Sequence, residues 1–597
     1  MSLERELARD LDALAAAGRR RTLPGPAVGV DFASNDYLDL ARSPALVAAA
    51  RDAILQHGAG GRAARLLGGG SPLEVRLEAA VADWLGAAAG LFFPSGYQAN
   101  VGLVSALAGP GDVVVADELV HASLVDGARL SRALVLVHRH GDAEHLAACL
   151  RTQPARAARR RLVLTESVFS MDGDLAPLAA LLQVCAEHAA HLVVDEAHAA
   201  GLLGPRRAGL AAPFADAPQL AARVVTGGKA LGAGGAVVVG GRALVDWLHN
   251  RARSFVFTTA ASPAVPAAFL AAVSQVRADG GASERALAAA RRLAAALGVP
   301  APAAAIVPFV LGDERTALAA AATAQAAGFD VRAVRPPTVP AGSSRLRLVC
   351  RAGHGEIEID ALATVLQPFR AAVGASAARA ARRGPLVVAG TDTDVGKTVV
   401  AALLALALAR AVPAASYWKP VQTGADDDTA SVRRLTGDAG VTLRAPRWSL
   451  PLPASPHAAA RAAGATIEPL TLAQDFAALA ADTIVELAGG LLVPLDERTT
   501  QLDLLLHVRP RPRVVLVARA GLGTLNHTLL SLEALRRRRL EPEALFLVGD
   551  PHPSNRATLQ AMGGVARVYE VPRFAELSPG ALATWLAAHD LSWLVSA

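Results

Sequence analysis

A strand-like segment, a glycine-rich loop and a long apolar helix follow one another in the middle of this chain. The segment PLVVAG begins at Pro385, the loop GTDTDVGKT covers residues 390–398, and an apolar helix is expected from about Lys397 to Arg410. This order is typical of the first strand and helix of a new α/β domain. Because 597 residues are also too many for one hydrophobic core, we predict that a second domain begins here.

The residues before this point have an α/β pattern of their own. Apolar runs at 162–166, 191–196 and 235–241 alternate with alanine-rich helical stretches, which indicates a largely parallel, layered sheet. Residues 371–384 are small, basic and unpatterned, as a linker would be. We therefore predict two α/β domains, with the N-terminal one over residues 1–373, a linker over 374–384 and the C-terminal one over 385–597.

Composition and charge limit the environment and the partners of the chain. The longest apolar run, from Val399 to Ala409, is far shorter than a membrane helix, and the charged N-terminus has no signal-peptide pattern. Three scattered cysteines match no metal spacing, so we expect a reducing, cytoplasmic location. The net charge of +6 is slight for this length, and the basic runs are short. We therefore expect neither nucleic acid nor a membrane as a partner.

Lysine is almost absent, which makes each lysine informative. The chain has 59 basic residues, of which only Lys229, Lys397 and Lys419 are lysines and the other 56 are arginines. Arginine stays protonated and cannot form a Schiff base, and its planar group is not a compact charge beside a phosphate. The three lysines are therefore candidates for chemistry that arginine cannot perform.

Polar groups suited to a cofactor surround the first of these lysines in the sequence. Lys229 lies in VVTGGKALGAGG, where two preceding glycines leave room for a cofactor against the backbone. Asp195 ends the apolar segment HLVVD, and a carboxylate there can hold a pyridinium nitrogen protonated, as pyridoxal phosphate (PLP) chemistry requires. Loops at strand ends are where open α/β sheets bind ligands. Further polar side chains of such loops are His121, Ser170, His198 and Thr226.

In this order, these segments resemble the α-oxoamine synthase family of PLP enzymes of fold type I, over essentially residues 1–370. The resemblance implies that Lys229 forms the Schiff base with PLP, that Asp195 pairs with the pyridinium nitrogen, and that His121 stacks on the ring. It also implies a homodimer with the site at the interface. The other cofactor contacts that it implies are His198 and Ser170 near the ring oxygen, Gly96 and Tyr97 at the phosphate, and Thr258 and Thr259 from the partner chain, with Thr226 beside them.

Within that family, VRAVRPPTVPAGSSRLRL (331–348) is most similar to the 8-amino-7-oxononanoate synthases. The resemblance implies decarboxylative condensation of L-alanine with a pimeloyl thioester, carried on coenzyme A or on a carrier protein. Arg347 would bind the amino-acid carboxylate, since arginine binds carboxylates bidentately. One departure is Glu74, where relatives carry a histidine. The further substrate contacts implied are Arg19, Asn35, Arg335 and Thr338.

The loop at 390–398 is a phosphate-loop candidate with irregular spacing. Gly390 lies one residue further from Gly396 than the strict pattern requires, but backbone amides and the helix N-terminus still suit phosphates. Lys397 would meet the β- and γ-phosphate oxygens, and Thr398 offers a magnesium ligand. Glu486, which we place at the end of a strand-like run, offers a second.

Together with YWKPVQTG (417–424) and SPH (455–457), this loop makes residues 385–597 similar to the dethiobiotin synthetase family. The resemblance implies a P-loop parallel sheet with helices on both faces, and closure of 7,8-diaminononanoate with CO2, ATP and Mg²⁺. Lys397 and Lys419 would stabilise the carbamate and the transferred phosphoryl group, with Thr423 at the substrate. The metal ligands implied are Thr398, Asp428 and Glu486. The nucleotide contacts implied are Gly390, Thr391, Asp392, Thr393, Asp394, Val395, Gly396, Lys397, Thr398, Glu486, Gly489, Gly549 and Pro572.

The second domain departs from this family pattern at two positions, and each of the two domains has an alternative interpretation. Leu487 replaces a glycine expected beside the substrate, and Gly549 replaces an asparagine that reads adenine in many relatives, so we expect relaxed nucleotide selectivity. The first domain could instead be another α-oxoamine synthase, such as a ketobutyrate ligase. The second could be a partition-type switch ATPase. Lys419 and the SPH segment favour the synthetase.

Overall fold

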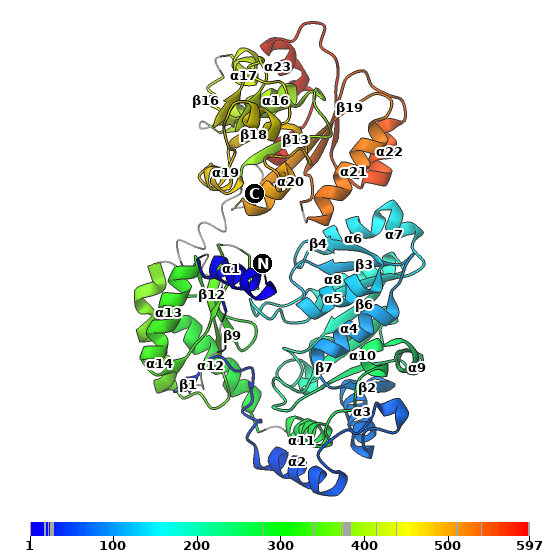
Figure 1. Ribbon diagram of the computed structural model, residues 1–597. Helices are drawn as coiled ribbons and strands as arrows, with labels where there is room; N and C mark the ends of the chain where they lie inside the picture. The colour runs from blue at the N-terminus through cyan, green and yellow to red at the C-terminus, as the bar shows by residue number, and fades with distance from the viewer. Residues whose placement is uncertain are drawn as a thin grey trace. The chain divides into compact units, whose positions relative to one another are not determined.

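The computed structural model forms two compact units, Met1–Ala377 and Ala378–Ala597 (Figure 1). The predicted linker lies outside the described residues except for Gly384. The structure describes residues 2–16, 20–21, 23, 29–278, 280–336, 338–340, 342–371, 373, 384–412, 415–437, 439–508, 511–538 and 540–594.

A seven-stranded sheet forms the centre of the first unit, in the order β2-β8-β7-β6-β5-β3-β4. Only β8 runs antiparallel to its neighbours, so the predicted layered and largely parallel α/β fold is confirmed. The strands are β2 (Ala89–Phe93), β3 (Val113–Asp117), β4 (Leu134–His138), β5 (Arg161–Glu166), β6 (His191–Asp195), β7 (Leu220–Thr226) and β8 (Ala236–Gly240).

Helices cover both faces of this sheet because successive strand residues point to opposite sides. In β3, Val114 packs with the helices of one face, whereas Val113 and Val115 pack with those of the other. The first face is covered by α4 (Gly96–Leu107), α5 (Ala122–Ser131), α9 (Arg242–Arg251) and α10 (Arg253–Val256). The second is covered by α2 (Pro44–His57), α3 (Pro72–Leu85), α6 (Ala143–Arg151), α7 (Gln153–Ala157), α8 (Leu178–Glu187) and α11 (Ala264–Ala278).

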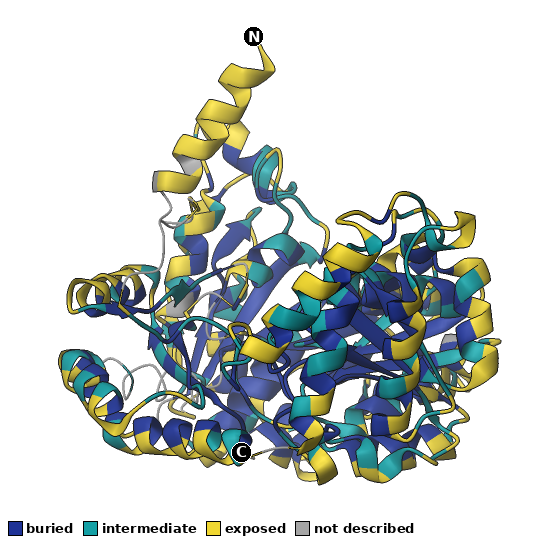
Figure 2. Cartoon of the chain, turned by 90° about the horizontal axis from the view of Figure 1, so that it is seen from below, coloured by how far each residue is buried: buried dark blue, intermediate teal, exposed yellow. Residues whose placement is uncertain are grey.

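A smaller antiparallel sheet, β11-β12-β9, completes the first unit and carries Arg347 on its middle strand. Its helices pack on it around a separate core that contains Phe309 and Leu348. The exposed helix α1 (Leu3–Ala16) is yellow in Figure 2, whereas most central strands of the two large sheets are dark blue. The elements are β9 (Ile306–Gly312), β11 (Ala333–Val334), β12 (Ser344–Val349), α12 (Ala282–Leu297), α13 (Glu314–Ala326) and α14 (Glu356–Leu366), with β1 (Val30–Asp31) paired to β10 (Phe329–Asp330).

The second unit is built on a seven-stranded sheet in which every pair is parallel, in the order β16-β14-β18-β13-β19-β20-β21. The predicted parallel sheet is therefore confirmed. Its strands are β13 (Leu386–Gly390), β14 (Ser416–Trp418), β16 (Thr442–Arg444), β18 (Thr483–Gly490), β19 (Arg513–Arg519), β20 (Ala544–Val548) and β21 (Val568–Val571). A short parallel pair joins β15 (Val421–Thr423) to β17 (Trp448–Leu450).

The helices of this unit also lie on both faces of its sheet. Leu386 and Val388 of β13 pack with α16, whereas Val387 and Ala389 pack with the opposite helices. One face carries α16 (Lys397–Ala411), α17 (Asp428–Thr436) and α23 (Pro579–Ala587). The other carries α18 (Pro456–Ala462), α19 (Pro469–Ala477), α20 (Gln501–His507), α21 (Thr524–Arg537) and α22 (Asn555–Gly563).

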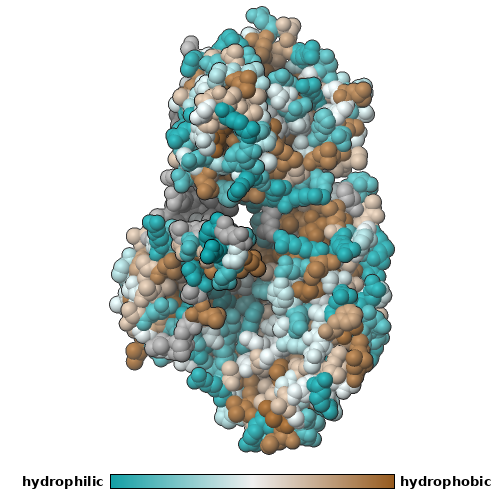
Figure 3. Space-filling model, viewed as in Figure 1, coloured by the Kyte–Doolittle hydropathy of each residue, from teal (hydrophilic) through white to brown (hydrophobic). Residues whose placement is uncertain are grey.

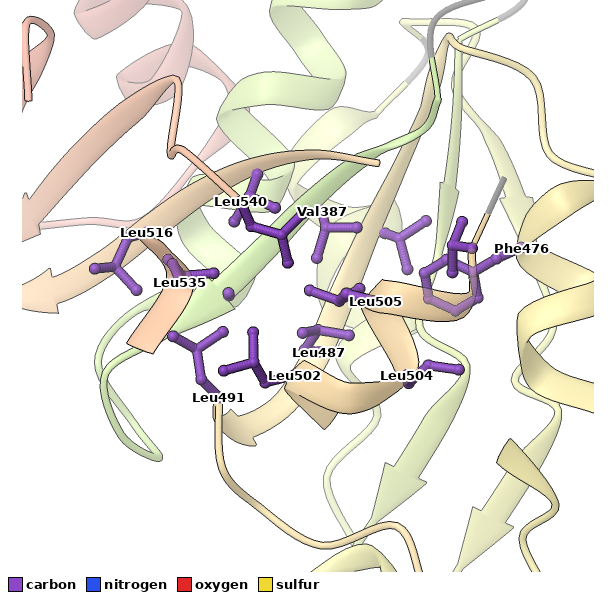
Figure 4. Packing of buried hydrophobic residues seen from close by; sticks show 14 of the residues in the cluster. Val387, Phe476, Leu487, Leu491, Leu502, Leu504, Leu505, Leu516, Leu535 and Leu540 are labelled. Atoms are coloured by element: carbon purple, nitrogen blue, oxygen red, sulfur yellow. The ribbon is translucent and has the colours of Figure 1, made fainter. Parts of the chain in front are cut away.

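The structure corrects the expected surroundings of two residues in β18. Glu486 is not at a strand end but inside this eight-residue strand. Leu487 follows it and therefore points to the opposite face, where it packs in the core with Leu491 and Leu502 (Figure 4). The leucine that replaces glycine thus fills an apolar core, and its side chain is directed away from Glu486.

Among the described residues, no helix has both the length and the apolar character to cross a membrane. Figure 3 shows brown apolar side chains interspersed with teal hydrophilic ones over the visible face of both units.

Candidate active sites

The first unit brings Lys229 and His198 together beyond the carboxyl ends of β7 and β6. Lys229 Nζ lies 2.6 Å from His198 Nε2, and the Tyr37 hydroxyl lies 2.7 Å from His198 Nδ1. Arg347 donates to Asn35 Oδ1 at 2.9 Å and reaches the Tyr37 hydroxyl at 3.5 Å. A continuous polar chain therefore joins the lysine to the arginine, although its members come from four separate parts of the sequence.

Asp195 ends β6, as predicted, and a second polar chain holds it in place. Its Oδ2 accepts from Asn100 Nδ2 at 2.7 Å, and Asn100 also donates to Ser123 Oγ at 2.9 Å. Ser123 Oγ in turn lies 2.7 Å from His121 Nδ1. Because Asn100 and Ser123 are buried, the carboxylate of Asp195 is fixed in position in the same network as His121.

Burial shifts Lys229 toward its neutral form, compared with an exposed lysine. Burial, followed by the charge of Arg347, lowers the pKa of Lys229 to about 8, although Asp195 and Glu166 oppose this shift. Burial and the neighbouring Asp195 raise the pKa of Glu166 to about 8. Burial also lowers the pKa of His198 well below its usual value, so its ring is neutral. A lysine of this kind can serve as a nucleophile and as a proton acceptor.

The first turn of α4 supplies a site for an anion beside Thr226, three residues before Lys229. A Cβ added to Gly96 would lie 2.6 Å from Thr226 Cγ2, so glycine lets this turn approach Thr226 closely. Thr226 Oγ1 is buried and has no hydrogen-bond partner among the residues described. Helix N-termini bind phosphate through their first amides. This set of groups fits PLP. Lys229 offers an amine and Asp195 a carboxylate, and the Thr226 hydroxyl and the N-terminus of α4 suit its phosphate.

Hydrogen bonds place two of the other predicted cofactor contacts, Ser170 beside Arg347 and Thr258 beside α4. The backbone carbonyl of Ser170 accepts a hydrogen bond from Arg347 Nε. Gln98 Nε2 donates to Thr258 Oγ1 of the same chain at 3.5 Å, which brings Thr258 to the first turn of α4. Tyr97, in that turn, is half exposed, and Thr259 is exposed.

On the predicted acyl side, Arg21 contacts Thr338. Arg21 donates to Thr338 Oγ1 at 2.9 Å. Arg19, which we predicted for this position, lies outside the described residues, and Arg335 follows β11.

The structure also explains Glu74. Its side chain is fully buried and accepts from the backbone amide of Ser71 at 2.8 Å and from its hydroxyl at 2.7 Å, which closes a capping box at the start of α3. The carboxylate that replaces histidine therefore stabilises a helix terminus.

In the second unit, the loop between β13 and α16 has the geometry of a phosphate cradle. Gly396 has a φ of 94°, and a Cβ there would lie 2.7 Å from Val548 Cγ1, so glycine is required. Lys397 Nζ donates to the carbonyl of Asp392 at 2.9 Å, which holds the lysine across the loop. The longer spacing to Gly390 thus still produces a compact loop at the start of a helix.

The predicted metal ligands come together with the third lysine. Lys419 forms a close ion pair with Asp428, and its Nζ lies 2.9 Å from Glu486 Oε1. Thr398 Oγ1 lies 2.9 Å from Asp428 Oδ1 and from Glu486 Oε1. Although burial opposes it, the two carboxylates raise the pKa of Lys419, so its ammonium remains charged.

The oxygen donors of this cluster fit Mg²⁺ held jointly with a nucleotide. No three His, Cys, Asp or Glu side chains in the described part of the chain are grouped to hold a metal ion by themselves. Thr398, Asp428 and Glu486 instead offer two carboxylates and a hydroxyl. Mg²⁺ in nucleotide sites is bound by one or two carboxylates together with phosphate oxygens and water.

The remaining predicted contacts of this unit lie at the carboxyl edge of its sheet or close to it. Gly549 follows β20, and the exposed Pro572 follows β21. A Cβ on Gly489 would lie 3.3 Å from Thr393 Oγ1, so Gly489 is adjacent to the phosphate loop. Within that loop, the Thr391 amide donates to the carbonyl of Val517. Asp394 has a positive φ, and Val395 is buried. Outside the loop, Thr423 is the last residue of β15.

Comparison with known proteins assigns the first unit to a family. The family model for aminotransferase class I and II matches residues 27–366, and an AAA-domain model matches residues 385–581. The chain belongs to the aminotransferase class I and II family. The 8-amino-7-oxononanoate synthase of Anaeromyxobacter dehalogenans (strain 2CP-1) is 48% identical to this aminotransferase-family chain over 379 residues, which cover 60% of the chain and 94% of the relative.

Solved structures agree with this assignment of the aminotransferase-family unit. A serine palmitoyltransferase from Sphingomonas wittichii has a TM-score of 0.58 at 29% identity and covers 62% of this chain and 98% of its own. An SPT structure with PLP has a TM-score of 0.57 at 28% identity, covering 63% of this chain and 100% of its own. The first unit therefore has the PLP-dependent transferase fold of type I, as predicted, and the second is a P-loop domain.

Several residues of the two sites were not identified from the sequence of this aminotransferase-family member. Tyr37 lies two residues after Asn35, and Asn100 lies three residues after Tyr97, but nothing in their spacing shows that they contact His198 and Asp195. Glu166 is the last residue of β5, and its position beside Asp195 depends on strand order.

A charged histidine connects the sheet of the aminotransferase-family unit to the loop that carries Ser170. His140 Nδ1 lies 3.0 Å from Asp117 Oδ1, and His140 Nε2 lies 2.6 Å from Asp174 Oδ2. The ring also packs edge-on against Phe169. Burial alone would lower the pKa of His140, but its hydrogen bonds to Asp117 and Asp174 raise that pKa to about 10.

We expect His140→Gln to lower the free energy of unfolding of this unit by about 2 kcal/mol, as loss of charge-assisted hydrogen bonds does. Because the folded pKa lies above the ordinary value of 6.5, the stabilisation is complete below about pH 6.5 and is lost as the pH rises through about 10. Calorimetry at about pH 6 and pH 10 measures the difference. The exposed His191→Gln is the control; a difference independent of pH would contradict this account.

Proposed function

We propose that the first unit condenses L-alanine with a pimeloyl thioester, with loss of CO2, to form 8-amino-7-oxononanoate. The observation that carries this proposal is the pairing of Lys229 with the neutral His198, in a unit 48% identical to a synthase of that name. Lys229 would hold PLP, Asp195 would face its ring nitrogen, and α4 with Thr226 would take its phosphate. PLP supplies, when bound, an electron sink for negative charge at the α-carbon of the amino acid.

The residues of the polar chain have separate tasks in this reaction. Arg347 binds the alanine carboxylate, with Asn35 and Tyr37 fixing the orientation of its guanidinium group. Lys229 accepts the α-proton of alanine, since its lowered pKa makes the neutral amine more available than in an exposed lysine. Arg21 and Thr338 lie on the acyl side. Because residues 1–370 resemble the α-oxoamine synthases, which implies a homodimer, we propose that this chain also forms a homodimer.

Borohydride reduction tests this assignment. The purified chain should show a visible absorbance band from bound PLP, and reduction should attach PLP to the peptide that contains Lys229. Attachment to another peptide, or no bound PLP, would reject the assignment. Incubation with alanine and with glycine, each with pimeloyl and acetyl thioesters, separates the proposed synthase from the ketobutyrate-ligase type.

For the second unit, we propose the ATP- and CO2-dependent closure of 7,8-diaminononanoate to dethiobiotin. The observation that supports it is the position of Lys419, which lies between Asp428 and Glu486 beside the phosphate loop. Lys397 and Lys419 provide compact positive charge for phosphoryl and carbamate oxygens, and Thr423 contacts the diamine. Mg²⁺ supplies, when bound, charge neutralisation at the phosphates. Phosphoryl transfer depends mainly on such positioning and charge.

A switch ATPase is the second candidate for this unit, because the AAA-domain match is compatible with either activity. The two differ in how ATP turnover responds to the diamine. A synthetase forms ADP only when ATP phosphorylates the carbamate made from the diamine and CO2, so its turnover should depend on 7,8-diaminononanoate. ATP turnover that is unchanged by the diamine would favour the switch ATPase.

We expect the second unit to accept several nucleotides. Gly549 has no side chain to pair with a purine edge, and losing one such contact relaxes discrimination by about ten- to a hundredfold. The comparison is kcat/KM for ATP, GTP and CTP in the full chain. A preference for ATP of about a thousandfold or more would show that other residues read the base. Gly549→Asn is not a simple control, because the φ of 121° at this position strains any residue with a side chain.

A further inference from the structure

Tyr417 is a buried tyrosine that contacts the metal-binding cluster but has no part in the function proposed above. It lies in β14 and is completely inaccessible to solvent. Its hydroxyl donates to Glu486 Oε2 at 2.9 Å. Within the described residues, this is the only hydrogen bond that Glu486 Oε2 receives, whereas Oε1 faces both Lys419 and Thr398.

The strand register explains how Tyr417 reaches this carboxylate. β14 and β18 are parallel neighbours, and Tyr417 pairs with Ile484. Glu486 lies two residues beyond Ile484, so its side chain is on the same face of the sheet and diagonal to Tyr417. This contact is therefore built into the sheet and does not depend on a loop.

The hydrogen bond gives the two oxygens of Glu486 different surroundings. The terminal torsion of a glutamate is broad and permits rotation of its carboxylate. Tyr417 occupies one oxygen and so directs the other toward Thr398 and Lys419, where the proposed metal ligands converge. Removing the hydroxyl would leave a buried carboxylate oxygen without its donor, and buried polar groups are costly when unpaired.

We propose that Tyr417 is a positioning residue that orients Glu486 to bind the magnesium ion of the nucleotide complex. This inference rests on the proposed nucleotide-dependent function of the second unit. It concerns metal binding, which can be measured without the diamine. Its failure is therefore distinguishable from the absence of cyclic-urea synthesis.

The test compares Tyr417→Phe with the matched control Tyr569→Phe. The Tyr569 hydroxyl donates to the carbonyl of Asp590 at 2.7 Å and lies in β21, at the opposite edge of the sheet from β16 and β14. Mn²⁺ binding is measured by electron paramagnetic resonance in the full chain with a non-hydrolysable ATP analogue. We expect Tyr417→Phe to raise the Mn²⁺ dissociation constant about tenfold or more, as loss of a hydrogen bond to a charged group does, and Tyr569→Phe to leave it unchanged.

Two further results decide between positioning and a purely structural role. In a Glu486→Gln background, Tyr417→Phe should add little to the loss of metal affinity, because the two residues act through one contact. In turnover assays, the apparent KM for Mg²⁺ should rise while kcat at saturating metal changes little. The proposal is overturned if Tyr417→Phe binds Mn²⁺ like the unmodified chain, if its effect persists in the Gln background, or if the variant does not fold.

Discussion

Lys229→Ala is expected to abolish formation of 8-amino-7-oxononanoate, with a loss of about a thousandfold or more, because one side chain holds the cofactor and transfers the proton. The visible absorbance of lysine-bound PLP should disappear as well. Diamine-dependent ATP turnover should remain within about twofold, since the phosphate loop belongs to the other compact unit. Both activities are measured on the same purified variant.

The reciprocal variant provides the control for this experiment. A chain with an altered Lys419 should retain condensation and lose cyclic-urea formation. If Lys229→Ala remains folded and loses both activities, the two units do not work independently and the proposal of two separate sites is wrong.

Lys419→Arg should reduce cyclic-urea formation by about a hundredfold or more although the charge is kept. The ammonium of Lys419 contacts Asp428 and Glu486 within a buried cluster, where the larger planar guanidinium group cannot occupy the same position. A displacement of about 1 Å in such a site costs on the order of a hundredfold in rate. Product formation by mass spectrometry measures the loss.

Arg537→Lys is a suitable control for Lys419→Arg, because Arg537 forms an exposed ion pair with Glu533 on α21 and should tolerate the exchange. Near-normal turnover by Lys419→Arg would show that position 419 needs only a positive charge. In that case the assignment of Lys419 to the reacting oxygens would be withdrawn.

The sequence was most informative where chemistry restricts the residue type. Three lysines in an arginine-rich chain mark both sites, and the structure places each in a polar cluster or at a phosphate loop. Asp195 was also predicted correctly at a strand end, because apolar runs and their boundaries are visible in the sequence. The largely parallel sheet of the first unit followed from the same runs, although the run at 235–241 forms the antiparallel strand β8.

The partners of these residues were harder to predict, because they come from distant segments. Tyr37 contacts His198, which is 161 positions away in the sequence, and Tyr417 contacts Glu486 only because β14 and β18 are neighbours in the sheet. The strand end expected at Glu486 was wrong, since β18 continues through AGG to Gly490. Strand order and register are properties of the whole sheet, which local patterns do not contain.

Formation of labelled dethiobiotin by the full chain tests the central claim of two biotin-pathway activities most directly. The purified protein is incubated with 7,8-diaminononanoate, ¹³C-bicarbonate, ATP and Mg²⁺, and the products are analysed by mass spectrometry. We predict dethiobiotin with ¹³C in its urea carbonyl, formed together with ADP and dependent on the diamine. ATP hydrolysis without labelled product, at a rate that the diamine does not change, would contradict the account.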